Sequence, residues 1–267
     1  MKNLLLFAVL VSLPLLLGGC GDNTVEEKQG GVQDAVHLEE PDAEIKTVEA
    51  ISFSPHLKYE IEDDAVTITG CEEEASGNLI IPAIIKNKTV NKIGKEAFYG
   101  CASLTNISLP DSVTHIEAFA FGECKALTNI ELPNGLTNIE TGAFVESGLE
   151  RVTIPDGVSV IGLGAFDGCS KITSIIIPDS VNTIAGSTFN RCSNMKNITI
   201  PESVTKIEPD AFGFCKILTA VTFLGDAPKV GNTIMFEASF TIYRKADAKG
   251  WGDTLAGRPV KLISEKP

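Results

Sequence analysis

Apolar residues recur with a period of 22 or 23 residues between Val90 and Leu224. Five prolines mark this period, and successive members are separated by 23, 22, 23 and 23 residues: Pro110, Pro133, Pro155, Pro178 and Pro201. Within each unit the same positions stay apolar, whereas Asp, Ser, Thr, Asn, Glu and Gly fill the positions between them. A unit this short cannot bury its own apolar side and must stack on its neighbours. The pattern therefore predicts a solenoid of about six coils over residues 83–224.

The unit that begins at Pro110 indicates which elements make up one coil. Residues 127–132 end in alternating apolar and polar side chains, which predicts a short strand. Pro133 ends this strand, because proline has no N–H to donate to the next ladder position. Residues 113–116 predict a shorter extended segment, and residues 117–124 predict one tight helical or 3₁₀ turn. Stacking places the long strands in a parallel β-sheet, which we expect on the concave side, with the turns and short strands on the convex side.

Aromatic residues mark both the interior and the end of the predicted array. Six phenylalanines occupy one position of the unit: Phe98, Phe121, Phe144, Phe166, Phe189 and Phe212. We expect their rings to stack in a column, each ring packing on the ring of the next coil. The single tryptophan, Trp251, lies beyond the last unit. Because a terminal coil needs a cover over its open apolar end, we expect Trp251 to pack against a final strand over residues 240–243.

Five cysteines also share one position of the unit: Cys101, Cys124, Cys169, Cys192 and Cys215. A zinc site needs four ligands at one point, which a column spread along an axis does not provide. Disulfides between neighbouring coils are the alternative, but a free cysteine is among the most buried residue types, so we interpret the column as buried thiols. Cys71 lies outside the column, and its state stays open. The third coil is one residue short and carries Ser147 at the cysteine position, which predicts a local bulge or a tighter turn.

The N-terminus begins with Met1-Lys2-Asn3 and continues with fourteen mostly apolar residues, Leu4 to Leu17. Such a segment is too short to span a bilayer, and residues 1–19 are typical of a secretory signal peptide. The sequence Leu17-Gly18-Gly19-Cys20 resembles the lipobox of bacterial lipoproteins, in which a peptidase cuts before the cysteine and the sulfur carries diacylglycerol. The resemblance implies an extracytoplasmic protein that is lipid-anchored to a bacterial membrane through Cys20. The alternative is an ordinary secretory signal with an incidental cysteine.

Charge is concentrated in the segment that follows Cys20. Residues 21–50 hold nine acidic residues against two lysines, so residues 20–55 are predicted to form an acidic disordered tether. The whole chain has a net charge of −13. A chain this acidic is not drawn to nucleic acid or to anionic lipid, so we expect no nucleic-acid partner and contact with the membrane through the lipid anchor only.

The combination V-x-x-I, A-F-x-x-C and L-x-x-I-x-[LI] resembles the BspA-like class of leucine-rich repeat found in bacterial surface proteins. The resemblance runs from Lys58 to about Ile263, with an N-terminal cap over residues 56–82 and a C-terminal cap over residues 225–267. It implies a leucine-rich repeat solenoid on the cell surface that binds other proteins or host matrix. The family supplies no catalytic residues to transfer to this chain.

Residues suited to catalysis are few and scattered. The three histidines are His37 and His56, which precede the repeats, and His115, which lies at an outward position of one short strand. No G-x-S-x-G, H-E-x-x-H or P-loop motif occurs in the sequence. We therefore expect no enzyme activity, no cofactor and no metal site.

Function is then to be sought at outward positions of the long strands, where the core does not dictate the residue type. Nine of these positions are the predicted ligand contacts: Asn106, Asn129, Glu131, Arg151, Thr153, Ser174, Ile176, Asn197 and Thr199. Ser108, Ala220 and Thr222 complete the strip. Arg151 and Ile176 break its small, polar character and are the first candidates for binding hot spots. We expect a monomer that binds a protein or glycan ligand on this face; the alternative is an envelope spacer or scaffold without a specific ligand.

Overall fold

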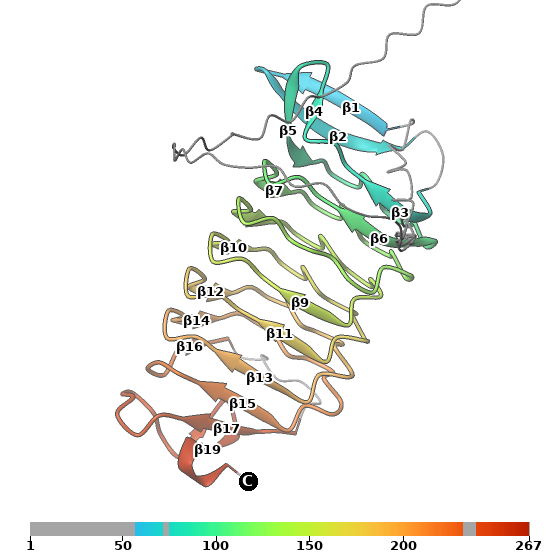
Figure 1. Cartoon of the computed structure of the whole chain (residues 1–267). Helices are drawn as coiled ribbons and strands as arrows, with labels where there is room; N and C mark the ends of the chain where they lie inside the picture. The colour runs from blue at the N-terminus through green and yellow to red at the C-terminus, as the bar shows by residue number, and fades with distance from the viewer. Residues whose placement is uncertain (1–56, 72–74, 232–238, 267) are drawn as a thin grey trace, which may run out of the picture. The chain divides into compact units, whose positions relative to one another are not determined.

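The computed structural model describes residues 57–71, 75–231 and 239–266, which form a mainly-β solenoid of stacked coils (Figure 1). The predicted signal peptide, Cys20 and the predicted tether lie outside the described residues. Within the described ranges, no helix is long and apolar enough to cross a membrane. The repeat pattern therefore predicted the fold class, and parallel stacking of the coils is confirmed.

The long strands lie on one side of the stack, where they pair in parallel within three separate sheets (Figure 1). The first sheet pairs β3 (Gly77–Ile80) with β6 (Leu104–Ser108), and the second pairs β9 (Arg151–Thr153) with β11 (Ser174–Ile176). The third joins β13 (Asn197–Ile200), β15 (Ala220–Phe223), β17 (Thr241–Arg244) and β19 (Arg258–Leu262). The ladder thus extends beyond the predicted repeats at both ends.

The strand predicted over residues 127–132 does not form. An isolated parallel bridge between Ser108 and Glu131 takes its place. The Glu150 N–H donates to the Thr128 C=O at 3.0 Å, but no ladder joins the second and third coils here. The third coil is one residue short at Gly148, but its backbone stays in step with the second coil, because the bond from Glu150 to Thr128 is the counterpart of the bond from the Thr173 N–H to the Glu150 C=O in the next coil. The long-strand sheet is therefore interrupted at the second coil, and it is interrupted again between β11 and β13, where the coils have the regular length.

The short strands form a second row on another side of the stack. Four of them follow β2 (Ala65–Cys71) in one sheet: β5 (Lys88–Ile93), β7 (His115–Ile116), β8 (Asn138–Ile139) and β10 (Val160–Ile161). Three more form the next sheet: β12 (Thr183–Ile184), β14 (Lys206–Ile207) and β16 (Lys229–Val230). Antiparallel pairs close the stack, with β1 (Leu57–Glu62) on β2, β4 (Ile84–Ile85) on β5, and β18 (Thr254–Leu255) on β19.

The tight turn predicted over residues 117–124 is present but is not helical. The Ala120 N–H donates to the Glu117 C=O within the coil, whereas the Phe121 N–H donates to the Ala143 C=O of the next coil at 2.8 Å. Bonds within and between coils alternate in this way because Phe119 and Glu123 have positive φ angles of 59° and 57°. A helix would direct every N–H along its own axis. The alternation instead lets each turn bond to its neighbour, so it stiffens the stack.

The predicted phenylalanine column is confirmed. Successive rings, from Phe98 to Phe212, stack with centroid separations of 5.4 to 5.9 Å and interplanar angles of 7° to 13°. Each of these six side chains is fully buried. Each coil therefore contributes one fully buried aromatic ring to the core.

The cysteine column consists of buried residues that hydrogen-bond to the preceding coil. The thiols of Cys124, Cys169 and Cys215 donate to the carbonyl oxygens of Phe98, Phe144 and Phe189 at 3.1, 2.9 and 3.1 Å. Burial raises the pKa of these three thiols to about 12. Cys71 is a half-buried free thiol. The interpretation of the column as packing rather than disulfides is confirmed for these residues.

Trp251 packs at the C-terminal end of the repeats. Its ring meets Phe223 edge-to-face with a centroid separation of 5.1 Å, and its Nε1–H donates to the Gly225 carbonyl oxygen at 3.3 Å. The predicted partner strand, residues 240–243, corresponds to β17, which lies one rung beyond β15. Trp251 therefore covers the end of β15.

Candidate binding surface

The outward side chains of the long strands form a surface that we call the long-strand face. Along β9, β11 and β13 every second side chain is exposed, because the backbone pleat turns alternate residues into the core. Val152, Ile175 and Ile198 are buried. The predicted contacts on these strands are all exposed: Arg151, Thr153, Ser174, Ile176, Asn197 and Thr199.

The register of β9 and β11 brings Arg151 and Ile176 close together on this face. Arg151 pairs with Ser174, and Thr153 pairs with Ile176, in the parallel ladder of β9 and β11. Neighbouring strands lie about 4.8 Å apart, so one ligand group can contact both rungs. Arg151 and Ile176 are thus diagonal neighbours, and a guanidinium and an exposed aliphatic side chain lie on one small area.

The remaining predicted contacts lie toward the N-terminal end. Asn106, Asn129 and Glu131 are exposed as predicted. Asn129 and Glu131 stand on the irregular second coil rather than on a strand, so their spacing differs from that of the ladder. They do not line the hollow on β11 and β13 described next.

A hollow of about 420 Å³ lies along β11 and β13. Its lining includes four predicted residues, Ser174, Ile176, Asn197 and Thr199. It also includes residues that were not among the predicted ligand contacts, at the ends of the strands and just beyond them: Asp156, Pro178, Asp179, Pro201 and Leu224. These follow from the repeat, because Asp156 and Asp179 each come directly after the proline that ends a strand. The side chain of Ile176 is 59% exposed, which leaves apolar surface beside polar groups in one hollow.

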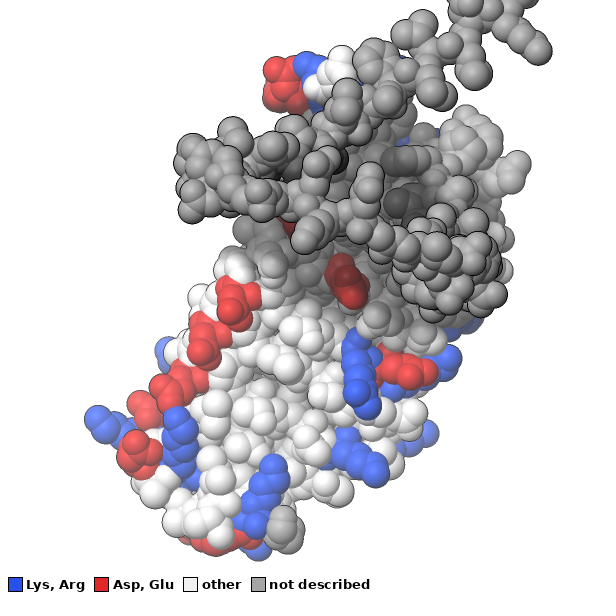
Figure 2. Space-filling model, in the orientation of Figure 1, with Lys and Arg blue, Asp and Glu red and all other residues white. Residues whose placement is uncertain are grey.

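Charge on this face is arranged along an edge rather than across the middle. The residue after the repeat proline is acidic in four coils, and all four are exposed: Asp111, Asp156, Asp179 and Glu202. Figure 2 shows acidic side chains in a row at one edge and mostly uncharged side chains in the middle of the face. Glu202 accepts a hydrogen bond from the Lys245 ammonium group, which neutralises one end of the row. Lysine and arginine side chains stand along the other margin of the same view (Figure 2).

The strip ends earlier than the sequence predicted, because the C-terminal residues cover it. Thr222, an expected outward residue of β15, is only 7% exposed, and Ala220 is also buried. The Lys266 ammonium nitrogen lies 3.3 Å from the Thr222 hydroxyl oxygen and 5.8 Å from the centroid of the Tyr243 ring. Lys266 follows the 3₁₀ helix η1 (Ile263–Glu265), which lies directly after β19. The open part of the face therefore stops at β13.

The described residues contain no group of three or more His, Cys, Asp or Glu side chains arranged to hold a metal ion. His115 is half-buried, and its Nδ1 lies 2.9 Å from the Thr114 hydroxyl oxygen. His37 and His56 lie outside the described residues.

Comparison with known proteins places these features in a family. The family described as "BspA type Leucine rich repeat region" matches residues 91–219 in six copies. A search of curated proteins finds no match for the sequence.

Solved structures give a consistent result. The T. pallidum leucine-rich repeat protein TpLRR is 30% identical to this chain, with a TM-score of 0.62, over 67% of this chain and 85% of that one. A leucine-rich repeat protein from Bacteroides ovatus is 22% identical, with a TM-score of 0.52, over 78% of this chain and 76% of that one. The pneumococcal vaccine antigen PcpA is 24% identical, with a TM-score of 0.54, over 64% of this chain and 49% of that one. The last two likenesses show the fold alone.

Proposed function

The chain belongs to the BspA-type leucine-rich repeat family, and from this premise we propose that it is a non-catalytic protein that binds a protein ligand through its long-strand face. The observation that carries the proposal is the hollow on β11 and β13, where the exposed Ile176 stands among polar side chains. An exposed aliphatic anchor in a hollow, bordered by an arginine, is a typical centre of a protein interface. Solenoids present such faces because adjacent coils align equivalent positions.

The ligand-binding proposal is tested with a double substitution, Arg151→Glu with Ile176→Asp. The full chain is coupled to beads, and bead adhesion to an immobilised extracellular-matrix extract is measured. We expect adhesion to fall at least about tenfold, because loss of two hot-spot residues costs more than 1.4 kcal/mol. Both side chains are exposed, so the melting temperature should stay the same.

A matched control places equivalent charge changes on the short-strand side, with Val160→Asp and Lys229→Glu. Val160 is 40% exposed and Lys229 is exposed, so these changes alter charge without touching the long-strand face. The control should bind as the unchanged chain does. Equal adhesion of the Arg151/Ile176 variant and the unchanged chain would contradict the assignment and favour a spacer without a specific ligand.

The second part of the proposal is a lipid anchor at Cys20 and a position outside the cytoplasm, at the bacterial surface. It is supported by the sequence Leu17-Gly18-Gly19-Cys20 after an apolar segment. Metabolic labelling with a fatty-acid analogue should mark the unchanged chain and not Cys20→Ser. Protease treatment of intact cells should then degrade the repeat array; protection from protease would place the array on the inner side of the envelope.

A further inference from the structure

The long-strand face carries opposite charges at its two margins. Its strands run parallel, so they all begin at one margin and all end at the other. Asp156 and Asp179 follow the ends of β9 and β11. Arg151 begins β9, Lys196 directly precedes β13, and Lys171 stands in the segment that leads into β11. All five side chains are exposed, and Figure 2 shows the two signs on opposite sides of a mostly uncharged middle.

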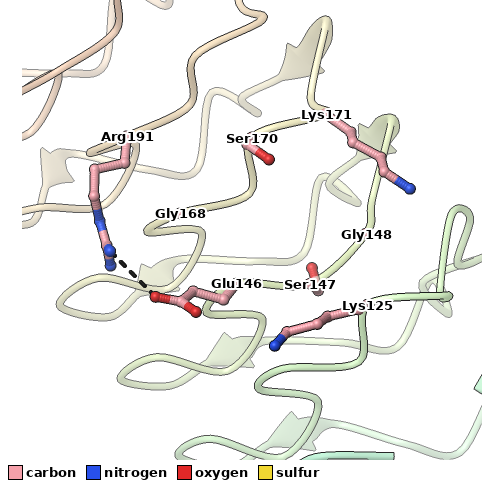
Figure 3. A pocket seen from close by; sticks show the side chains of 8 residues that line it. All are labelled: Lys125, Glu146, Ser147, Gly148, Gly168, Ser170, Lys171 and Arg191. Carbon is pink, nitrogen blue, oxygen red and sulfur yellow. Dashed lines mark hydrogen bonds and ion pairs between the residues drawn. The ribbon is translucent and has the colours of Figure 1, made fainter. Parts of the chain in front are cut away.

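These charges have no partner of opposite sign within the described part of the chain, where none of the five side chains forms an ion pair. The turn side differs, because its charges are matched between coils. Figure 3 shows the ion pair of Arg191 with Glu146 there, and the Lys171 side chain points away from that pair. Glu150 is exposed next to Arg151, but positive charges still outnumber negative ones on that margin.

Main-chain hydrogen bonds hold the coils together on the turn side as well as in the strand ladders. The Phe144 N–H donates to the Ala165 C=O of the next coil at 2.8 Å, and the Phe166 N–H donates to the Thr188 C=O at 3.0 Å. A solenoid curves strongly when one side of each repeat is spaced more widely than the other. Here the turns are no more widely spaced than hydrogen-bonded strands, so the concavity expected of the strand side is slight. Two such faces can meet over several coils.

The arrangement of the two margins makes the face complementary to itself. Half a turn about an axis parallel to the stack turns a second copy toward the first and reverses the direction of its strands. Each coil then lies opposite the same coil of the other copy. Asp156 of one copy lies opposite Arg151 of the other, and Asp179 lies opposite Lys171. Half a turn about an axis along the strands would instead place like charges together. The first arrangement is an isologous interface, in which both subunits use the same patch.

An apolar contact falls at the centre of the same arrangement. The Ile176 side chain is 59% exposed and stands between the two margins. Because the strands are reversed and the coils stay level, Ile176 lies opposite its own counterpart. Thr153, on the neighbouring rung of the ladder, does the same. An apolar centre with a charged rim is the usual composition of a protein interface.

We propose that two copies of this chain pair through their long-strand faces, with a two-fold axis parallel to the stack. The proposal rests on the proposed function in that both use the same face. The pair covers the hollow on β11 and β13, so a ligand must displace the second copy before it reaches Ile176. A pair replaces the monomer expected from the sequence, because the two margins form only when the coils are stacked.

The test is sedimentation velocity of the full chain over a range of concentrations, without any ligand. The unchanged chain should show a monomer–dimer equilibrium. Lys171→Glu with Lys196→Glu, the basic-margin variant, makes both margins acidic. Asp156→Lys with Asp179→Lys, the acidic-margin variant, makes both margins basic. Each variant alone should associate at least about tenfold more weakly, because like charges then face each other. An equimolar mixture of the two should pair again. An unchanged chain that is monomeric at every concentration overturns the proposal.

A matched control makes the same change of charge elsewhere, with Lys92→Glu and Lys229→Glu on the short-strand row. This control should associate as the unchanged chain does, and it should not pair with the acidic-margin variant. If the control associates as weakly as the basic-margin variant, net charge governs association and the long-strand face does not.

A disulfide tests the direction of the pairing. Thr153→Cys should give a linked dimer when dioxygen, with a copper catalyst, oxidises the two new thiols, because level coils bring position 153 of the two copies together. An antiparallel pair would not. Val160→Cys is the control, since Val160 is 40% exposed on the short-strand row, and it should stay unlinked. A dimer that Thr153→Cys does not link contradicts the proposed two-fold axis.

The pair and the ligand proposed for this face can fail separately, because self-association is measured in solution and adhesion on the immobilised matrix extract. A chain that adheres but stays monomeric overturns the pair and leaves ligand binding in place. A chain that pairs but does not adhere leaves the pair in place and removes the matrix ligand.

Discussion

The hydroxyl oxygen of Ser147 lies 3.3 Å from the sulfur of Cys169. Both side chains are buried, and the Cys169 thiol also donates to the Phe144 carbonyl oxygen at 2.9 Å. Serine thus occupies the cysteine position of the third coil and keeps a polar contact with the next member of the column. The column continues through the coil whose length is irregular.

The first prediction concerns this position. Ser147→Cys should fold normally and change the free energy of unfolding by less than about 1 kcal/mol, because a free thiol is a small apolar group suited to burial. Urea unfolding under reducing conditions measures the change. A loss above about 2 kcal/mol would show that the shortened coil fits a hydroxyl and excludes sulfur.

The phenylalanine column gives a second prediction. Phe166 is fully buried, with ring centroids of Phe144 and Phe189 at 5.4 and 5.9 Å on its two sides. Phe166→Ala should reduce the free energy of unfolding by about 3–5 kcal/mol, since a cavity opens between two rings. Ile217→Ala is the control, because Ile217 is 41% exposed and should lose less than about 1 kcal/mol. Similar losses at both positions would show that the phenylalanine column contributes no more to stability than an exposed side chain.

The repeated core could be predicted from the sequence because each coil presents the same environment to its neighbours. Phe121 and Cys124 have equivalents at fixed spacing, so their burial followed from the pattern alone. The exposed alternate residues of β9, β11 and β13 followed in the same way, from a period of two.

Features that depend on one coil or on distant segments could not be predicted. Thr222 stands at an outward strand position of the repeat, but Lys266, which is 44 positions later and outside the repeats, covers it. The close approach of the second and third coils at Gly148 depends on one residue that is missing from a single coil. The strand expected over residues 127–132 is reduced to a single bridge between Ser108 and Glu131, which the repeat pattern does not indicate either. The repeat pattern describes each coil separately, so it does not reveal contacts that one particular coil makes with another or with a segment outside the repeats.

Alkaline pH should destabilise the protein through its buried thiols. Burial raises the pKa of Cys124, Cys169 and Cys215 to about 12, whereas an unfolded cysteine titrates near pH 8.5. Between these values the unfolded chain loses protons that the folded chain keeps, so stability is fully present below about pH 8.5 and falls as pH rises toward 12. Each thiol contributes a slope of about 1.4 kcal/mol per pH unit.

The thiol prediction is checked by urea unfolding at several pH values between 8 and 10.5 in the presence of a reducing agent. Cys215→Ser removes one titrating group, so the free energy of unfolding should fall less steeply, by about 1.4 kcal/mol per pH unit. An identical pH dependence in the two proteins would assign the alkaline loss to other groups.

The last prediction concerns Gly148 and the packing of the third coil on the second. Gly148→Ala places a Cβ atom 2.2 Å from the Lys125 carbonyl oxygen, and both atoms are tied to main chain that cannot move independently. The coils must shift apart, and the free energy of unfolding should fall by about 1–3 kcal/mol, as for other overpacked sites. Gly252→Ala is the matched control, since the nearest atom to its Cβ would be 3.7 Å away, and it should change stability by less than about 0.5 kcal/mol. Thermal unfolding of the two variants measures the difference. If Gly148→Ala were as stable as the control, the main chains of the second and third coils could move apart at no cost, and their close contact at Gly148 would not contribute to stability.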